Sequence, residues 1–220
     1  MTLRRRIEHS KLLAGVLAGL AGAYLRFCRA TTRWQREGFD DLAADLAEGP
    51  VLVVMWHECS LMGPLLWPLE MGPLSTLYAS SPIGRVSGAL QRQSGLQPME
   101  MAEGTSNLAA SRVVLRRVRE GSSIGIAADG PLGPARQVKD APLDWARAMQ
   151  RPVYGFAYRT SRGRKLKTWD QMWLPLPFAR GRVVFARWDG APGRRDDNAA
   201  WRDSLTGFLN DQSDQVARPI

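Results

Sequence analysis

The sequence predicts a single α/β domain, in which a mostly parallel mixed sheet is flanked by helices, with an apolar helix at its N-terminus. From residue 50 onward, short apolar runs alternate with segments of helical periodicity, which is typical of parallel strands joined by helices. The first run, residues 50–56, is apolar throughout, as in a strand buried on both faces. A length of 220 residues suits one such domain with a terminal extension.

The N-terminal extension carries an apolar run, residues 12–25, with arginines on both sides. Its 14 residues are fewer than the ~20 that span a bilayer as a helix. Three interpretations compete: a secretory signal with a small-residue cleavage site, a monotopic membrane anchor with its arginines on lipid phosphates, and a buried helix. The positive charge continues to Arg36, which favours the anchor. We therefore divide the chain into residues 1–36, a basic leader with a membrane-associating helix, and residues 37–220, the α/β domain.

Within the domain, each element is predicted from its pattern. Short apolar runs bounded by turn-forming residues predict strands, and apolar residues at helical spacing predict helices. The expected strands are residues 50–56, 74–80, 96–101, 123–128, 153–159, 172–178 and 182–188. The expected helices are residues 106–120, which Gly121 ends, 140–150, and 196 to about 216. Since ligands of such sheets bind at the carboxyl ends of strands, two places deserve inspection: residues 56–58 and 128–131.

Charge and composition restrict the classes of partner. The 30 Lys and Arg outnumber the 21 Asp and Glu, for a net charge of +9, which favours a phosphate-bearing substrate or a phospholipid surface. Nucleic acid is not an expected partner, because no binding motif accompanies the charge. The histidines, His9 and His57, and the cysteines, Cys28 and Cys59, are too few for a disulfide framework or a zinc site of the usual spacing. We expect no metal.

His57 is the candidate general base. It follows the most apolar expected strand, and imidazole titrates near neutral pH. Cys59 is an alternative nucleophile with His57 as its base. Side chains two residues apart point away from each other if a helix starts there, and we interpret Cys59 as a core residue.

The most distinctive string is Asp-Gly-Pro-Leu-Gly-Pro at residues 129–134. Two glycines and two prolines in six residues force an irregular turn directly after an expected strand. Such a turn presents backbone N–H groups and the Asp129 carboxylate to a ligand, although a plain strand-ending turn explains it equally well. Arg136 follows closely, where a guanidinium can bind a phosphate.

Together these strings resemble the lysophospholipid acyltransferase superfamily, and more narrowly an uncharacterised bacterial branch of it. The resemblance covers residues 50–185 and rests on the order and spacing of five motifs. They are Trp56-His57, Gly104-Thr105-Ser106 before a helix, the turn at 129–134, Trp169-Asp170, and Pro-Leu-Pro-Phe at 175–178. Without a ligand, Thr105 or Ser106 simply caps the helix that follows.

The resemblance implies an enzyme at the cytoplasmic face of a bacterial inner membrane, peripheral or monotopic. It implies transfer of a fatty acyl group from acyl-CoA or acyl carrier protein to a lysophospholipid-type hydroxyl, with no bound cofactor. We expect catalysis by His57 and Asp129. The expected substrate-binding residues are Gly104, Thr105, Ser106, Gly130, Pro131, Arg136 and Arg85.

The chain departs from the family pattern around its histidine. In the superfamily an Asp five residues after the histidine orients the imidazole, and here that position is Met62. Glu58, Asp129 or a backbone carbonyl is left to orient the ring. Losing such a carboxylate costs on the order of a thousandfold in a triad-like system.

Two further departures affect the expected phosphate site. The usual arginine of the turn is Leu132, and residues 80–85 lack the Asp common in the branch. Arg85 and Arg136 are the candidates to replace the missing guanidinium. These departures motivate an alternative function, a catalytically degenerate member that binds lipid or a partner enzyme. A weaker alternative is a thioesterase or phospholipase, in which water replaces the acceptor.

Overall fold

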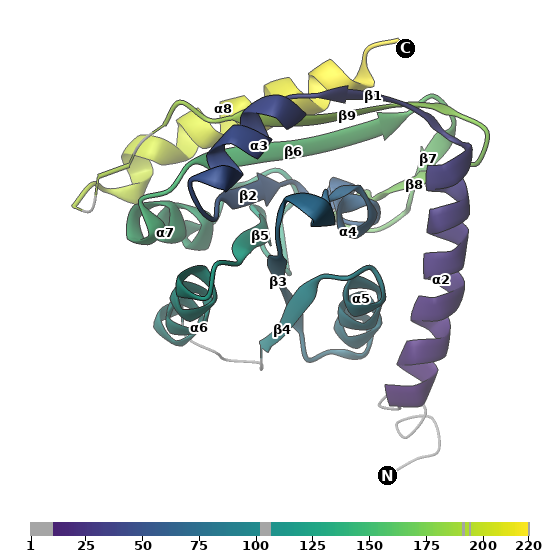
Figure 1. The fold of residues 1–220 in the computed structure, drawn as a ribbon, viewed down its shortest axis with the longest axis horizontal. Helices are drawn as coiled ribbons and strands as arrows, with labels where there is room; N and C mark the ends of the chain where they lie inside the picture. Colours follow the sequence, from purple (N-terminus) through teal and green to yellow (C-terminus); the bar gives the residue numbers. More distant parts are fainter. Residues whose placement is uncertain (1–10, 102–106, 191, 194, 220) are drawn as a thin grey trace.

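The computed structural model describes residues 11–101, 107–190, 192–193 and 195–219, and it is built around a seven-stranded sheet (Figure 1). The strand order is β1-β9-β6-β2-β5-β3-β4, and every neighbouring pair is parallel except β6 and β9. The strands are β1 (Arg33–Glu37), β2 (Leu52–Met55), β3 (Leu74–Ala79), β4 (Gln97–Met101), β5 (Ser123–Ala127), β6 (Val153–Thr160) and β9 (Arg180–Arg187). The predicted α/β domain with a mostly parallel mixed sheet is confirmed.

Helices cover both faces of this sheet. One face is covered by α2 (Lys11–Thr31), α3 (Phe39–Ala47), α4 (Gly63–Leu66) and α5 (Pro82–Gln93). The other is covered by α6 (Asn107–Arg119), α7 (Asp140–Met149) and α8 (Asn198–Ala217). Two 3-10 turns, η1 (His57–Cys59) and η2 (Leu69–Met71), and a small hairpin of β7 (Gly163–Lys165) and β8 (Trp173–Pro175) complete the fold.

The sequence of the central strand β2 is apolar throughout because both faces of the strand are buried. Successive side chains of a strand point to opposite faces. Val53 therefore packs in the core beneath α4 and α5, whereas Leu52 and Val54 pack in the core beneath α6, α7 and α8. All three are at most 1% exposed.

Helix α2 packs along α5 with one face only. Ala18, Gly22 and Leu25 are buried, and a Cβ on Gly22 would lie 3.2 Å from Leu90. The opposite face exposes large apolar side chains: Val16, Leu17, Leu20, Tyr24 and Phe27. No helix among the described residues is both long and apolar enough to cross a bilayer. The predicted division at residue 36 falls inside β1, which pairs with β9 in the main sheet.

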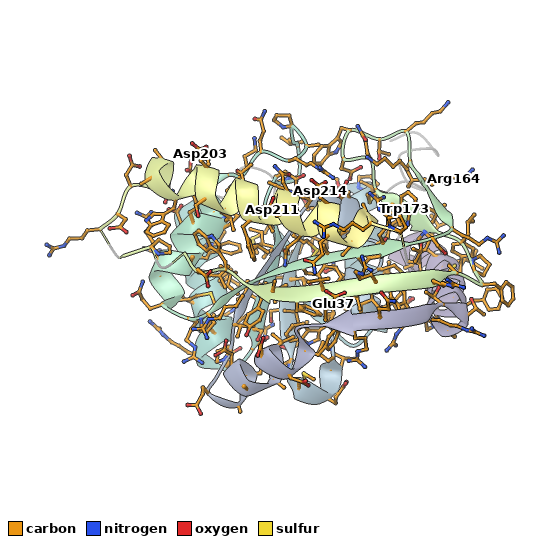
Figure 2. The ribbon with its side chains drawn as sticks, turned by 90° about the horizontal axis from the view of Figure 1, so that it is seen from above. Glu37, Arg164, Trp173, Asp203, Asp211 and Asp214 are labelled. Atoms are coloured by element: carbon orange, nitrogen blue, oxygen red, sulfur yellow. The ribbon has the colours of Figure 1, made fainter. Side chains whose placement is uncertain are left out.

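The C-terminal helix α8 packs on β6 and β9, on the face of the sheet that α6 and α7 also cover (Figure 2). Its buried residues include Leu205 and Leu209, while Asp203, Asp211 and Asp214 are exposed. The acidic side chains of this helix therefore lie on the solvent side of α8, away from its buried contact with the sheet.

Several elements differ from those the sequence patterns predict. Helix α3, helix α5 and the edge strand β1 were not expected, and the strand expected over 172–178 is limited to β8. Helix α5 has a weak apolar pattern because two of its buried positions are glycines. A Cβ on Gly84 would lie 2.0 Å from the Ala79 carbonyl oxygen, and one on Gly88 2.7 Å from the Tyr78 ring, so close packing on β3 requires residues that carry no apolar signal.

Candidate active site

The pairing of β2 with β5 brings the two predicted site regions together. The strands are parallel, with Met55 opposite Ala127. Continuing each chain by two residues leads to His57 on η1 and Asp129 in the following turn, at the same carboxyl edge of the sheet. Residues 72 positions apart thus become neighbours.

Asp129 orients the His57 ring. Its Oδ1 lies 2.8 Å from His57 Nδ1 and also accepts the His57 backbone N–H at 3.1 Å. The carboxylate is 1% exposed, and its Oδ2 accepts the Arg136 backbone N–H at 3.2 Å. A carboxylate oxygen that accepts this hydrogen bond pairs with the tautomer whose proton is on Nδ1, which leaves the Nε2 lone pair open to a substrate.

The other carboxylate near the histidine has a different partner. Glu58 is buried, and its Oε1 accepts a 2.8 Å charged hydrogen bond from Arg136 Nη2. This pair ties η1 to the segment that follows the Asp129 turn. Met62, the position at which the sequence resemblance led us to expect an orienting Asp, is fully buried in the core. Among the three orienters that the sequence left open, the structure selects Asp129.

Trp169 covers one side of the imidazole. The two ring centroids are 5.1 Å apart in an edge-to-face arrangement. The indole also packs on Gly133, where a Cβ would lie 2.6 Å from the ring. Buried Asp170 stabilises the segment that carries Trp169, because its Oδ1 accepts hydrogen bonds from the Thr168 hydroxyl and the Met172 backbone N–H. A side chain at Gly133 would collide with the indole, so the glycine of the turn allows Trp169 to lie beside the imidazole.

A cavity of about 470 Å³ begins at this wall and follows the sheet, a size typical of small-molecule sites. Its lining includes His57, Pro131 and Trp169, and along β3 it runs from Leu74 at the start of the strand to Ala79 at its end. Most of the other lining side chains are apolar, including Val53, Met55, Trp67, Leu96, Phe156 and Phe185. The arrangement places the His57 imidazole among the residues that line an otherwise mostly apolar space.

Cys59 does not belong to this chemistry. Its side chain is in the core beside Tyr158, and it is not among the residues that line the cavity. Burial raises the pKa of its thiol to about 12, so the nucleophilic thiolate is essentially absent at neutral pH. The interpretation of Cys59 as a core residue agrees with this position.

The remaining predicted site residues are distributed as follows. Gly104, Thr105 and Ser106 lie outside the described residues. Pro131 lines the cavity, and the N–H of Gly130 donates to the Ala127 carbonyl oxygen within the turn. Arg85 donates to the Ser80 carbonyl oxygen and is not among the cavity-lining residues. The described residues contain no cluster of three or more His, Cys, Asp and Glu suited to a metal ion.

Sequence reasoning missed two features of the site. Trp169 was noted only as part of a motif, and its contact with His57 spans 112 positions. The N-terminal end of α5, with Ser81 as N-cap, also lines the cavity. Ser81 as N-cap followed by Pro82 at the first helical position is a helix-start signal, but the glycines later in α5 weaken the helical pattern that should follow it.

No family model matches the sequence. It is 25% identical over 184 residues to an uncharacterized protein, RP090, of Rickettsia prowazekii (strain Madrid E), covering 83% of this chain and 84% of that protein. The fold is similar to that of the 1-acyl-sn-glycerophosphate (LPA) acyltransferase PlsC from Thermotoga maritima, with a TM-score of 0.53 and 11% identity. That similarity covers all of this chain and 85% of the other. The class that the structure defines is thus an α/β fold shared with an acyltransferase.

Proposed function

We propose that this protein is an acyltransferase, which moves a fatty acyl group from acyl-CoA or acyl carrier protein to a lysophospholipid-type hydroxyl. The single observation that carries the proposal is the Asp129–His57 pair, 2.8 Å apart, whose imidazole lines a mostly apolar cavity. The fold shared with an LPA acyltransferase supports it. The bound acyl chain would lie along β3, with its thioester carbonyl near His57.

The reaction needs one base and no bound cofactor. His57 Nε2 removes the proton from the acceptor hydroxyl, and the oxygen attacks the thioester carbonyl carbon. Asp129 stabilises the resulting imidazolium through Nδ1–H. When the tetrahedral intermediate collapses, the C–S bond breaks, the imidazolium returns its proton to the leaving thiolate, and the new ester remains. Trp169 limits the access of water to the base, which favours transfer over hydrolysis.

The acceptor headgroup is assigned to Arg136, which does not line the cavity itself but is tied to Glu58, the residue after His57. Arg136 is 37% exposed at its side chain and is bound to Glu58 through Nη2, so its remaining N–H groups can meet a phosphate oxygen. Backbone N–H groups near Gly104 and Thr105 or at Gly130 are the proposed oxyanion donors, and of these the Gly130 N–H is engaged within its own turn.

A membrane surface is the proposed place of action. The apolar outer face of α2 (Val16, Leu17, Leu20, Tyr24 and Phe27) would enter the acyl region of one leaflet. We propose a monotopic or peripheral association at the cytoplasmic face of a bacterial inner membrane. Such docking would shorten the path of a lipid acceptor to the cavity.

The test is acyl transfer by purified protein in mixed micelles, with a labelled long-chain acyl thioester and a panel of lysophospholipids. We expect a diacyl product that disappears with His57→Ala, while Arg112→Gln, which changes an exposed position of helix α6 that does not line the cavity, retains full activity. Free fatty acid in place of diacyl product would identify a thioesterase or phospholipase. No turnover by the wild type, with lipid binding retained, would support the degenerate binding role.

A further inference from the structure

Three linked polar side chains interrupt the apolar lining of the His57 cavity. They are Thr76 on β3 and Ser87 and Gln91 on α5. The Thr76 hydroxyl donates to Gln91 Oε1 at 2.6 Å, and Gln91 Nε2 donates to the Ser87 hydroxyl at 3.0 Å. Thr76 and Gln91 are buried, whereas Ser87, one turn earlier on the helix, is exposed. We call Thr76, Ser87 and Gln91 the polar trio.

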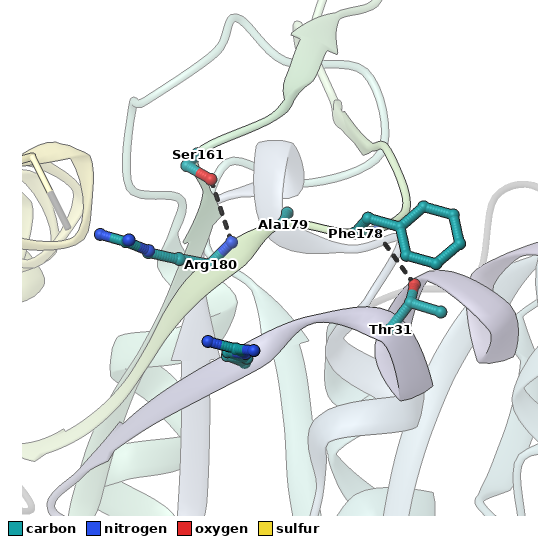
Figure 3. A pocket seen from close by; sticks show the side chains of 6 residues that line it. Thr31, Ser161, Phe178, Ala179 and Arg180 are labelled. Atoms are coloured by element: carbon teal, nitrogen blue, oxygen red, sulfur yellow. Dashed lines mark hydrogen bonds between the residues drawn. The ribbon is translucent and has the colours of Figure 1, made fainter.

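A second cavity, of about 540 Å³, shows what polar lining residues do when they serve the fold (Figure 3). It shares no lining residue with the His57 cavity. Its Thr31 hydroxyl accepts the Phe178 backbone N–H at 3.1 Å, and its Ser161 hydroxyl accepts the Arg180 backbone N–H at 3.0 Å. Each hydroxyl thereby fixes a segment of backbone. Within the described part of the chain, the side chains of the polar trio bond only to one another.

Each member of the polar trio can make more hydrogen bonds than it makes within the described residues. The Gln91 amide donates once and accepts once, Thr76 only donates and Ser87 only accepts, whereas an amide or a hydroxyl can do both more than once. A saturated hydrocarbon in the cavity would remove water from these groups and give them no new partner, which costs free energy. A chain with a hydroxyl at this level would supply both a donor and an acceptor.

Strand register fixes the depth of the polar trio relative to the candidate base. Thr76 is the register partner of Gly125 on β5, which is in turn the partner of Val53 on β2. Since His57 follows Val53 by four residues, Thr76 lies at most roughly 13 Å before His57 along the strand direction, at about 3.3 Å per residue. An extended alkyl chain advances about 1.3 Å per carbon–carbon bond. The polar trio is therefore about eight to ten carbons from a thioester held at His57.

We propose that the polar trio recognises a hydroxyl group in the middle of the acyl chain, so that the donor class of this site is a mid-chain hydroxyacyl thioester. The proposal rests on the acyl transfer proposed above and names the group transferred. The substrate hydroxyl would donate to Gln91 Oε1 or Thr76 Oγ1 and accept from Gln91 Nε2 or the Ser87 hydroxyl. The polar trio determines specificity only, and the reaction at His57 is unchanged.

The test compares 10-hydroxyoctadecanoyl-CoA with octadecanoyl-CoA as donors to one lysophospholipid in mixed micelles. We expect kcat/KM to be about 10- to 100-fold higher for the hydroxylated donor, because the plain chain leaves buried polar groups unsatisfied. The isomer 3-hydroxyoctadecanoyl-CoA carries its hydroxyl close to the thioester and should show no such preference. Thr76→Val/Gln91→Leu should bring the ratio to one or below, by slowing the hydroxylated donor and accelerating the plain one.

Three single variants control for damage to the fold. Gln93→Leu makes the same substitution at an exposed position of α5 that does not line the cavity, and it should keep the wild-type ratio. Thr76→Ser retains the hydroxyl and should keep most of the preference. Ser87→Ala changes an exposed side chain, so it tests the polar trio even where the double variant does not fold. We expect it to lower the ratio by about threefold.

The outcomes separate this site from the proposed reaction. Diacyl product formed equally from both donors, or a preference that survives Thr76→Val/Gln91→Leu, would overturn recognition by the polar trio and leave acyl transfer intact. An equal preference for the 3-hydroxy isomer would overturn the placement of the hydroxyl. If the wild type forms no product, tryptophan fluorescence measures binding of free 10-hydroxyoctadecanoate against octadecanoate. Tighter binding of the hydroxy acid that the double variant abolishes would keep the site and refute the transfer, whereas equal or absent binding would refute both.

Discussion

The carboxyl edge of β2 and β5 differs from the outer face of α2 in how its side chains are satisfied. At the edge, both oxygens of Asp129 accept hydrogen bonds from the chain itself, and Glu58 is paired with Arg136. On α2, Leu17, Leu20 and Phe27 are each 46% exposed or more, and their neighbours on the same stripe are exposed as well. The polar groups of the edge are therefore satisfied within the chain, whereas the large apolar side chains of the helix face remain exposed to solvent.

The two regions therefore depend on different kinds of interaction. The edge is held by directional hydrogen bonds, so small chemical changes there should alter rates while leaving the fold unchanged. The α2 face acts through area removed from water, which is non-directional and roughly additive. Variants of the two regions should therefore separate catalysis from localisation.

The largest effect is expected from Asp129→Asn. The amide keeps the shape of the side chain but can donate to Nδ1, which favours the tautomer with its proton on Nε2 and removes the base. We expect kcat/KM to fall by about 10³ to 10⁴, as for the corresponding change in a serine-protease triad, with a small change in KM. Steady-state kinetics in micelles measure it, and a loss below tenfold would contradict the orienting role.

The site and the fold were predictable from the sequence to different degrees. The apolar runs located β2 and β5, and the strand-end rule then placed His57 and Asp129 in one region. The sequence left three possible orienters because hydrogen bonding across 72 positions has no local signal. The Trp169 contact was beyond prediction for the same reason. Helix α5 was not predicted because two of its buried positions are Gly84 and Gly88. Their close packing on β3 is a tertiary requirement, and glycines at these positions weaken the helical pattern in the sequence.

The second effect concerns the helix face. Leu17→Ser/Leu20→Ser should weaken vesicle binding by about 150-fold or more, since each buried leucine contributes at least roughly 1.5 kcal/mol on transfer from water. Activity in detergent micelles and the melting temperature should stay unchanged, because both side chains are exposed in the folded chain. Leu69→Ser, an exposed leucine of η2, is the matched control. Equal vesicle binding by all three proteins would rule out docking through α2.

A smaller effect is expected from Trp169→Ala, which opens one side of the His57 ring. Water should then compete with the acceptor, raising the ratio of free fatty acid to diacyl product by about tenfold, on the order of 1.4 kcal/mol in relative barrier. Trp169→Phe keeps an aromatic edge near the imidazole and should restore most of the original ratio. Chromatography of the products measures the ratio of free fatty acid to diacyl product in each variant. An unchanged ratio with lower overall activity would mean that the indole only supports the turn at Gly133.

The smallest effect is expected from Cys59→Ala, and its value lies in separating two mechanisms. If Cys59 were a nucleophile that carried the acyl group, this variant would be inactive and a thiol reagent would inactivate the wild type. Because burial raises the pKa of the thiol to about 12, the folded protein holds almost no thiolate at pH 8. We therefore expect kcat/KM within about twofold of wild type and a stability loss of about 1 kcal/mol from the vacated core position.

The same pKa gives this variant a signature in pH. The thiol is neutral in the folded state up to about pH 12 and ionises from about pH 9 once unfolded. The stability that the buried neutral thiol contributes is therefore fully present below pH 9 and decreases as the pH rises toward 12. Denaturant unfolding from pH 8 to 11 should show a shallower loss of stability for Cys59→Ala than for the wild type. Parallel curves would mean that the thiol is accessible in the native state, and the mechanism with a cysteine nucleophile would have to be reconsidered.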